Sequence, residues 1–216
     1  MNYSKEKAIS IIHKSAIEYN NNLLNKNVLF LFSHNNKFDY LECSFTNNNF
    51  LHLTGVETNI EPMQFYNAAL SSNISLNDFN FKNDGTTELK LSVLLKLMNI
   101  HKVGRMVGDY DYSGRWLIAD KLAGTTTSIM GFIKDNNYYY PSSTLKENLS
   151  NIAKKPYSKI IATFMKTQKE NLYNELCYVI KDNELITEKT LKLIEDKVDF
   201  ENLTALFEIP MCFIRR

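Results

Sequence analysis

Apolar residues recur at helical spacing in several segments of the chain. Over residues 4–24 the apolar positions include Ala8, Ile9, Ile12, Ala16, Ile17, Leu23 and Leu24. This period of three to four predicts an amphipathic helix, and Ser4 is a suitable N-cap. Residues 61–70 predict a second helix with a proline in its first turn. Residues 86–101 predict a third that is buried, because it is apolar almost all round, and residues 187–198 predict a fourth.

Short apolar runs separated by Asn-rich turns predict β-hairpins in the rest of the chain. The predicted strands are residues 28–32, 38–45, 50–56, 125–134, 138–140, 159–166 and 172–181. The first three form an antiparallel meander in this prediction, and the others form two hairpins. Pro141 is expected to end its strand. No βαβ unit repeats, so we expect an α+β fold in which helices flank an antiparallel sheet.

Length and composition predict one main domain. The chain has 216 residues, enough to bury a core without staples. We expect an α+β domain over residues 1–182, with residues 183–216 packed on it as a helix and tail. The N-terminus has no signal-peptide pattern, and the longest apolar run is shorter than the roughly 20 residues that cross a bilayer. A cytoplasmic protein without a membrane partner is therefore expected.

Cofactor and metal motifs are absent from the sequence. No GxxxxGK[ST], GxGxxG, HExxH, GxSxG or CxxC string occurs. The three cysteines are far apart and are expected to be reduced thiols. His13, His34 and His101 are interpreted as structural or solvated, and no two histidines lie at i, i+3 or i+4. No cofactor and no metal site are therefore predicted.

His52 is the histidine most suggestive of chemistry. In the predicted strand 50–56, Phe50, His52 and Thr54 share one face, while the flanking leucines share the other. An imidazole and a hydroxyl on one face of a sheet could form a polar site. The alternative is a core histidine held by a neighbouring carbonyl.

Basic residues gather in the second half of the chain, although the net charge is only +1. Residues 141–181 contain seven lysines against three glutamates, interleaved with tyrosines. Lysines contact phosphates and tyrosines stack on bases. The pattern is thus typical of a nucleic-acid patch, and equally of a solvated basic face.

Two strings in this sequence resemble the opening of a known nuclease family. NNFLHLTGV, followed by EPMQFYNAAL, is similar to the fourth phage-associated group of the barnase, EndoU, colicin E5/D and RelE-like nucleases. YYYPSSTLKENLSN and KIIATFMKTQKENLYNELCYVIK resemble that group's later segments, so the similarity spans residues 25–182. It implies an antiparallel sheet flanked by helices and a metal-independent RNase.

In such an RNase the RNA 2′-hydroxyl attacks its own phosphate, assisted by a general base, a general acid and a cation. The resemblance implies His52 as the acid or base and Thr54 as its phosphate-binding or orienting neighbour. Lys159 and Lys166 are candidate cations on opposite faces of one strand, and Lys159 is preferred because it shares a face with Thr163. Further phosphate-binding candidates are Ser142, Ser143 and Lys146. No second titrating residue is identified.

Three classes of function remain open, of which the last is a plain interaction domain within a phage or transposon protein. The first is an endoribonuclease of a phage or mobile element, which cuts host RNA as a toxin or a CRISPR guide RNA as an anti-CRISPR enzyme. The second is a non-catalytic phage protein that binds and inhibits a host nucleoprotein such as a CRISPR effector. The expected partners are RNA, with a host nucleoprotein or a cognate inhibitor as further possibilities, inside a bacterial host cell.

Overall fold

The computed structural model describes residues 3–35, 37–112, 117–181 and 186–213. Its elements are α1 (Lys5–Asn22), β1 (Lys26–His34), β2 (Lys37–Ser44), the 3-10 helix η1 (Asn47–Asn49), α2 (Phe50–Thr54), α3 (Pro62–Leu70), α4 (Thr86–Leu97), α5 (Ile100–Val103), β3 (Met106–Asp109), β4 (Lys121–Gly124), β5 (Ile129–Asp135), β6 (Tyr138–Leu145), α6 (Leu149–Ile152), β7 (Ser158–Thr167), β8 (Glu175–Val179), α7 (Glu188–Lys192), β9 (Thr204–Ala205) and the 3-10 helix η3 (Met211–Phe213). No helix in this described part combines the length and apolar character that crossing a membrane requires.

The described strands form one nine-stranded sheet in the order β1-β2-β6-β5-β4-β3-β7-β8-β9. An additional pairing of β1 with β7 joins the two arms of this order, so the strands from β1 round to β7 close into a ring. Most neighbours are antiparallel, as predicted, but β2 pairs with β6 and β8 with β9 in parallel. The prediction of an α+β fold with a large sheet flanked by helices is confirmed.

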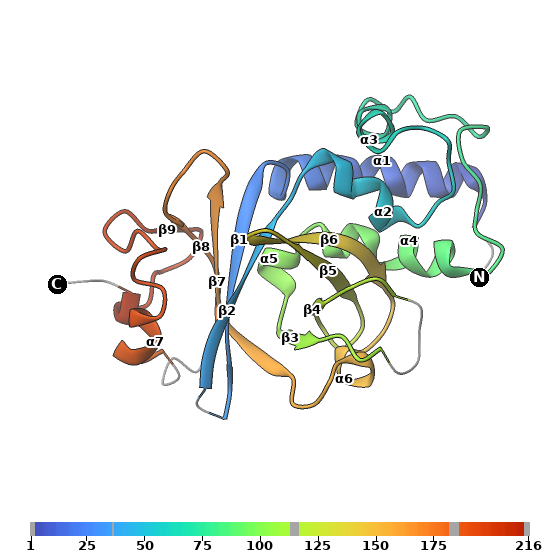
Figure 1. Ribbon diagram of the computed structural model, residues 1–216. Coiled ribbons are helices and arrows are strands. Elements are labelled where there is room, and N and C mark those ends of the chain that lie inside the picture. Colours follow the sequence, from blue (N-terminus) through green and yellow to red (C-terminus); the bar gives the residue numbers. More distant parts are fainter. Residues whose placement is uncertain (1–2, 36, 113–116, 182–185, 214–216) are drawn as a thin grey trace.

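Helices α1 to α5 lie together on one side of the sheet formed by β1, β2 and β7 (Figure 1). Ser4 caps α1 as predicted, because its hydroxyl accepts a hydrogen bond from the backbone N–H of Lys7 at 3.3 Å. The main core lies between these helices and the sheet. At its centre the Tyr19 ring lies tilted against Phe50 at a centroid distance of 5.4 Å and packs edge to face on Tyr66 at 5.9 Å.

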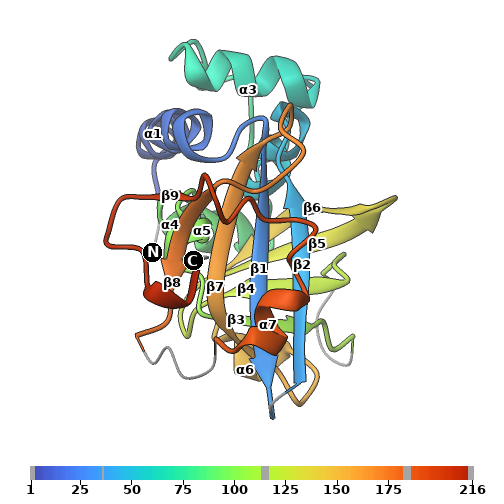
Figure 2. The same cartoon turned by 90° about the vertical axis from the view of Figure 1, so that its left-hand side faces the viewer.

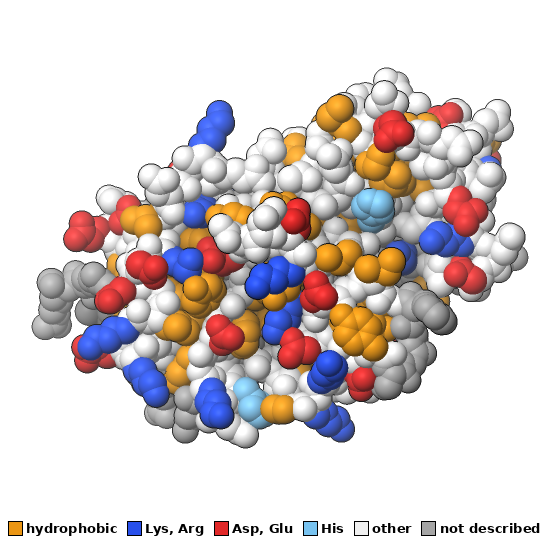
Figure 3. All heavy atoms as spheres, viewed as in Figure 1, with side chains coloured by type: hydrophobic (Ala, Val, Ile, Leu, Met, Phe, Trp, Pro, Cys, Tyr) orange, Lys and Arg blue, Asp and Glu red, His pale blue; other side chains and the backbone are white. Residues whose placement is uncertain are grey.

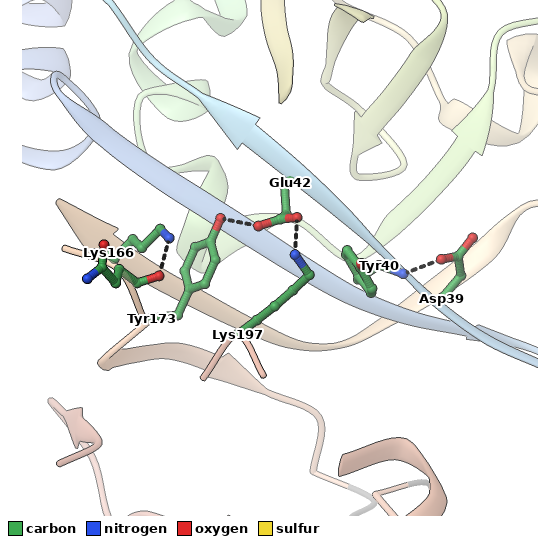
Figure 4. A network of polar contacts seen from close by, with 7 residues as sticks. Asp39, Tyr40, Glu42, Lys166, Tyr173 and Lys197 are labelled. Atoms are coloured by element: carbon green, nitrogen blue, oxygen red, sulfur yellow. Dashed lines mark hydrogen bonds and ion pairs between the residues drawn. The ribbon is translucent and has the colours of Figure 1, made fainter. Parts of the chain in front are cut away.

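Residues 186–213 cover the opposite face of the sheet, in front of β7 and β1 in Figure 2. Val198, Phe200 and Phe213 pack there against Leu31, Phe164 and other buried residues of β1, β7 and β8. A polar network adds to this contact (Figure 4). The expected division at residue 182 lies outside the described residues and stays a prediction.

The network centres on the Glu42 carboxylate of β2. Glu42 accepts hydrogen bonds from the Tyr173 hydroxyl at 3.1 Å and from Lys197 Nζ at 2.9 Å. Lys197 also lies 5.1 Å from the centroid of the Tyr40 ring. These contacts hold the segment that contains Lys197 on the sheet. Both side chains of the ion pair are largely buried, so water screens their attraction little.

The prediction of a strand at residues 50–56 is wrong, because this segment forms α2. Thr46 and Asn49 form a capping box that starts the helical run through η1. Gly55, with φ 71°, ends it in a left-handed conformation. Phe50, Leu53 and Thr54 are buried at the i, i+3 and i+4 positions of one helical face. Alternation over five residues fits this single turn as well as it fits a strand, and the expected meander is therefore a two-stranded hairpin.

Two other local predictions are corrected. Pro141 does not end its strand, because β6 runs through it at a register shift where Phe132 faces Pro141 and Gly131 faces Ser143. Proline is tolerated there because a bulge needs no N–H donor from it. The helix predicted over 187–198 shortens to α7, and the helix predicted over 86–101 divides into α4 and α5.

Candidate functional site

His52 lies on the exposed side of α2, at the edge of a cavity of about 470 Å³. Figure 3 shows a histidine side chain on the surface of this face, over the part of the molecule where Figure 1 draws α2. The cavity is bounded by α2 and the residues after it, by the segment before α4, by α4 itself and by β6. Its polar and charged lining side chains are His52, Glu57, Thr58, Lys82, Lys90, Ser142 and Ser143.

Lys90 of α4 is the cation that the fold brings to His52. Its Nζ donates a hydrogen bond to the His52 backbone carbonyl at 3.3 Å. Its aliphatic stem occupies the space beside Gly55, where a Cβ would lie only 2.4 Å from Lys90 Cδ. The Gly55 carbonyl accepts a hydrogen bond from the Thr87 hydroxyl at 2.6 Å, which fixes α2 to α4. The positive φ favours glycine at this position, and the Lys90 stem takes up the space that a side chain would occupy.

The electrostatics of the cavity suit proton transfer near neutral pH. Burial, helped by the charge of Lys82 and partly offset by Asp84, lowers the pKa of Lys90 to about 8. Partial burial, and then the charge of Lys90, lower the pKa of His52 below its ordinary value. At pH 7 the His52 imidazole is therefore mainly neutral, whereas Lys90 remains mainly charged.

A second cavity of about 470 Å³ adjoins the first and shares Lys82, Lys90, Leu117 and Ser143 with it. Lys146 is among the side chains that line this second part. We call the two cavities together the His52 groove. No described carboxylate forms an ion pair with Lys82, Lys90 or Lys146. Glu57 and Asp84 also line the groove, so its three lysines leave a small excess of positive charge that can meet an anion.

The structure brings four of the predicted site residues to the groove, and these are His52, Ser142, Ser143 and Lys146. The Ser142 hydroxyl donates to the Ile118 carbonyl at 2.8 Å, which ties β6 to the segment opposite. Thr54 is close in sequence but fully buried, and its hydroxyl donates to the Leu51 carbonyl at 2.7 Å. The Thr54 side chain thus supports α2 and does not face the groove.

The three predicted residues of β7 do not line the groove. Lys159 is exposed at the end of β7 that pairs with β1 and β3. Thr163 is fully buried within the sheet. Lys166 donates to the Asn171 carbonyl at 2.7 Å and lies 4.6 Å from the centroid of the Tyr173 ring. The resemblance had implied Lys159 with Thr163 beside His52, and the fold places Lys90 and Lys82 there instead.

Lys82 and Lys90 were missed because no motif marks them. For Lys90 the available signal was a lysine in a helix that is apolar almost all round, whereas Lys82 precedes that helix and carries no such signal. The stem of a lysine in such a helix lies along the apolar surface, and its ammonium group either reaches solvent or belongs to a binding or catalytic site. Among the described residues, no group of three or more His, Cys, Asp or Glu side chains is placed to hold a metal ion. The prediction of metal-independent chemistry is left untested by this observation.

Comparison with protein families matches the model described as phage-Barnase-EndoU-ColicinE5/D-RelE like nuclease4 to residues 11–182. Neither a curated protein nor a solved structure matches the chain. The family match covers most of the chain and includes α2, α4 and β6, which carry the groove. It confirms the resemblance drawn from the HLTG string. The chain therefore belongs to the phage-Barnase-EndoU-ColicinE5/D-RelE like nuclease4 family.

Proposed function

We propose that this nuclease is a metal-independent endoribonuclease and that the His52 groove is its active site. The observation that carries the proposal is the pairing of an exposed imidazole of lowered pKa with lysines that have no carboxylate partner among the described residues. A phosphodiester in the groove would meet a base and cations within one cavity. RNA supplies its own nucleophile, so the protein needs to move protons and stabilise charge.

His52 is the general base in this mechanism. Its neutral form at pH 7 accepts the proton of the ribose 2′-hydroxyl as that oxygen attacks the adjacent phosphorus. The new P–O2′ bond forms as the P–O5′ bond breaks, which gives a 2′,3′-cyclic phosphate and a free 5′-hydroxyl. Partial burial, and then the charge of Lys90, lower the pKa of His52 and so keep the imidazole neutral until it receives this proton.

Lys90 is the cation and the general acid. Its ammonium lies against the backbone of the residue that carries the base, so it is placed to hold the charge that develops on the phosphorane oxygens. With a pKa of about 8, it also releases a proton to the leaving 5′-oxygen more readily than an ordinary lysine. Lys82 and Ser143, which line both parts of the groove, are the proposed phosphate holders.

Glu57 lines the same cavity and is exposed, so it is the rival for the role of base. We assign the base to His52 because its lowered pKa provides the neutral acceptor at physiological pH. A Glu57→Gln variant that loses cleavage while His52→Ala retains it would transfer the role to Glu57.

The biological role that we propose is attack on RNA by a phage or mobile element. A toxin that cuts host RNA and an anti-CRISPR enzyme that cuts a guide RNA use the same chemistry, and they differ only in substrate. A non-catalytic protein that binds a host nucleoprotein is the alternative, because a basic groove also binds RNA without cutting it.

The decisive experiment incubates purified protein with total bacterial RNA, or with a guide RNA, in EDTA. We expect chelator-resistant cleavage that leaves 2′,3′-cyclic phosphate ends, and a rate that falls roughly 10²- to 10⁴-fold in His52→Ala. His13→Ala, which changes a histidine on α1 away from the groove, is the matched control and keeps the wild-type rate. Inhibition of a nucleoprotein without RNA cleavage, retained in His52→Ala, would support the alternative.

A further inference from the structure

Tyr112 is a large aromatic side chain that is exposed and yet held in place. Its exposed fraction is 62%. Its hydroxyl donates to the Ala119 carbonyl at 3.0 Å, and its ring packs edge to face on Tyr110 at a centroid distance of 5.0 Å. A tyrosine fixed at its hydroxyl and at one edge keeps an open ring surface for a partner without further loss of side-chain entropy.

The Tyr112 side chain lies next to the wall of the His52 groove. Ala119 directly follows Ile118, which lines the first cavity and is 78% exposed. The Ile118 carbonyl accepts the Ser142 hydroxyl at 2.8 Å, so the wall is tied to β6. An RNA strand that leaves the cavity over Ile118 would therefore pass the Tyr112 ring.

A cation and a carboxylate both lie beside the ring, and the Asp120 carboxylate accepts a hydrogen bond from the Tyr112 hydroxyl at 3.3 Å. Lys154 is exposed, and its Nζ lies 5.5 Å from the centroid of the Tyr112 ring. Asp109 is paired with Lys121, and Asp120 is hydrogen-bonded to the Lys134 backbone N–H at 2.8 Å, so neither carboxylate forms an ion pair with Lys154. Lys154 is thus placed to meet a phosphate.

We propose that Tyr112 and Lys154 form a second nucleotide subsite, which binds single-stranded RNA beside the scissile phosphate. One base stacks on the Tyr112 ring, and Lys154 contacts the phosphate attached to that nucleotide. This subsite rests on the proposed function to the extent that the groove binds RNA. Stacking on an aromatic ring tolerates every base, so the subsite gives affinity and position without a sequence preference.

The test measures binding of a fluorescein-labelled RNA octamer by anisotropy, with His52→Ala as the background so that cleavage does not interfere. Tyr112→Ala is expected to weaken binding roughly 5- to 100-fold, the range for loss of one base–aromatic stack. Tyr112→Phe keeps the ring and should bind within about twofold of the background. Lys154→Ala should lower the slope of log K against log salt concentration by about 0.7, the effect of one phosphate contact.

Tyr3→Ala is the matched control, because Tyr3 also lies under a lysine, Lys7, at 4.2 Å, but does not line the groove. If Tyr112→Ala does not fold, Tyr112→Leu, which keeps an apolar contact for Tyr110, takes its place. Unchanged octamer affinity in the ringless variant overturns the subsite, and so does a loss in Tyr112→Phe as large as in Tyr112→Ala. If the wild-type protein cuts no RNA, the endoribonuclease proposal is contradicted. Octamer binding that still depends on Tyr112 would then leave the subsite standing.

Discussion

Lysines line two polar regions on opposite sides of the sheet, and their partners differ. In the His52 groove, Lys82, Lys90 and Lys146 open to a cavity without an ion-pair partner among the described carboxylates. On the opposite face of the sheet, Lys197 belongs to the covering segment 186–213 and forms an ion pair with Glu42 of β2. A lysine whose charge has no carboxylate partner is available for binding. A lysine that is paired with a carboxylate and shielded from water by other residues contributes to stability instead.

The largest expected difference between the two regions comes from Lys90. Lys90→Met should lower RNA cleavage roughly 10²- to 10³-fold, as loss of one transition-state donor does. It should not weaken the fold, because it replaces a half-buried cation, whose burial lowers its pKa, by an apolar side chain of similar length. Lys96→Met, on the same helix but outside the groove, is the control. Wild-type cleavage in Lys90→Met would end the role assigned to this side chain.

The pH profile sharpens that result. Cleavage by the wild type should rise as His52 loses its proton, below its ordinary pKa, and fall as Lys90 loses its proton near pH 8. In Lys90→Met the falling limb should disappear. The rising limb should move to higher pH, because the charge that lowers the pKa of His52 is gone. A profile that is unchanged in this variant would contradict both assignments.

The next prediction concerns the ion pair of Glu42 with Lys197 and changes only the stability of the protein. Glu42→Gln should lower the free energy of unfolding by about 1–2 kcal/mol, because Lys197 and the Tyr173 hydroxyl lose a charged acceptor. Thermal melting should shift down by about 2–8 °C. Cleavage below the melting temperature should stay at the wild-type rate, since Glu42 does not line the groove.

Glu188→Gln provides the matched control for Glu42→Gln. Glu188 pairs with Lys192 at 3.6 Å, but both side chains are exposed, so its loss should change stability by a few tenths of a kcal/mol at most. Equal destabilisation by the two variants would show that burial under residues 186–213 adds nothing to the Glu42 ion pair.

The smallest expected effect is that of Lys159, the cation that the family resemblance favoured. Lys159→Ala should leave cleavage within about twofold of the wild type, because this side chain lies outside the groove. Lys82→Ala, which removes a cation from the groove, should slow cleavage roughly 5- to 10-fold through loss of a charged phosphate contact. The reverse order of the two rates would favour the site inferred from the family's pattern over the groove.

Local patterns carried most of the secondary structure. The period of residues 4–24 marks α1, Pro62 marks the start of α3, and two Asn-containing tips mark the β1–β2 and β5–β6 hairpins, whereas the TNNN string forms η1. These features could be predicted because capping, helical periodicity and turn conformation depend on residues close in sequence. The segment of α2 could not, because five alternating residues satisfy one helical turn as well as a strand, and burial of Phe50 and Leu53 in the core decided between them.

By itself, the sequence determined an α+β nuclease-family chain and singled out His52 through the HLTG string. Only the tertiary structure decided which cations surround that imidazole. Lys90 lies 38 residues away from His52 in the chain, and Lys146 comes from the end of β6. A contact between such distant residues follows from the packing of α2, α4 and β6 on one another, and no local periodicity or composition records that packing.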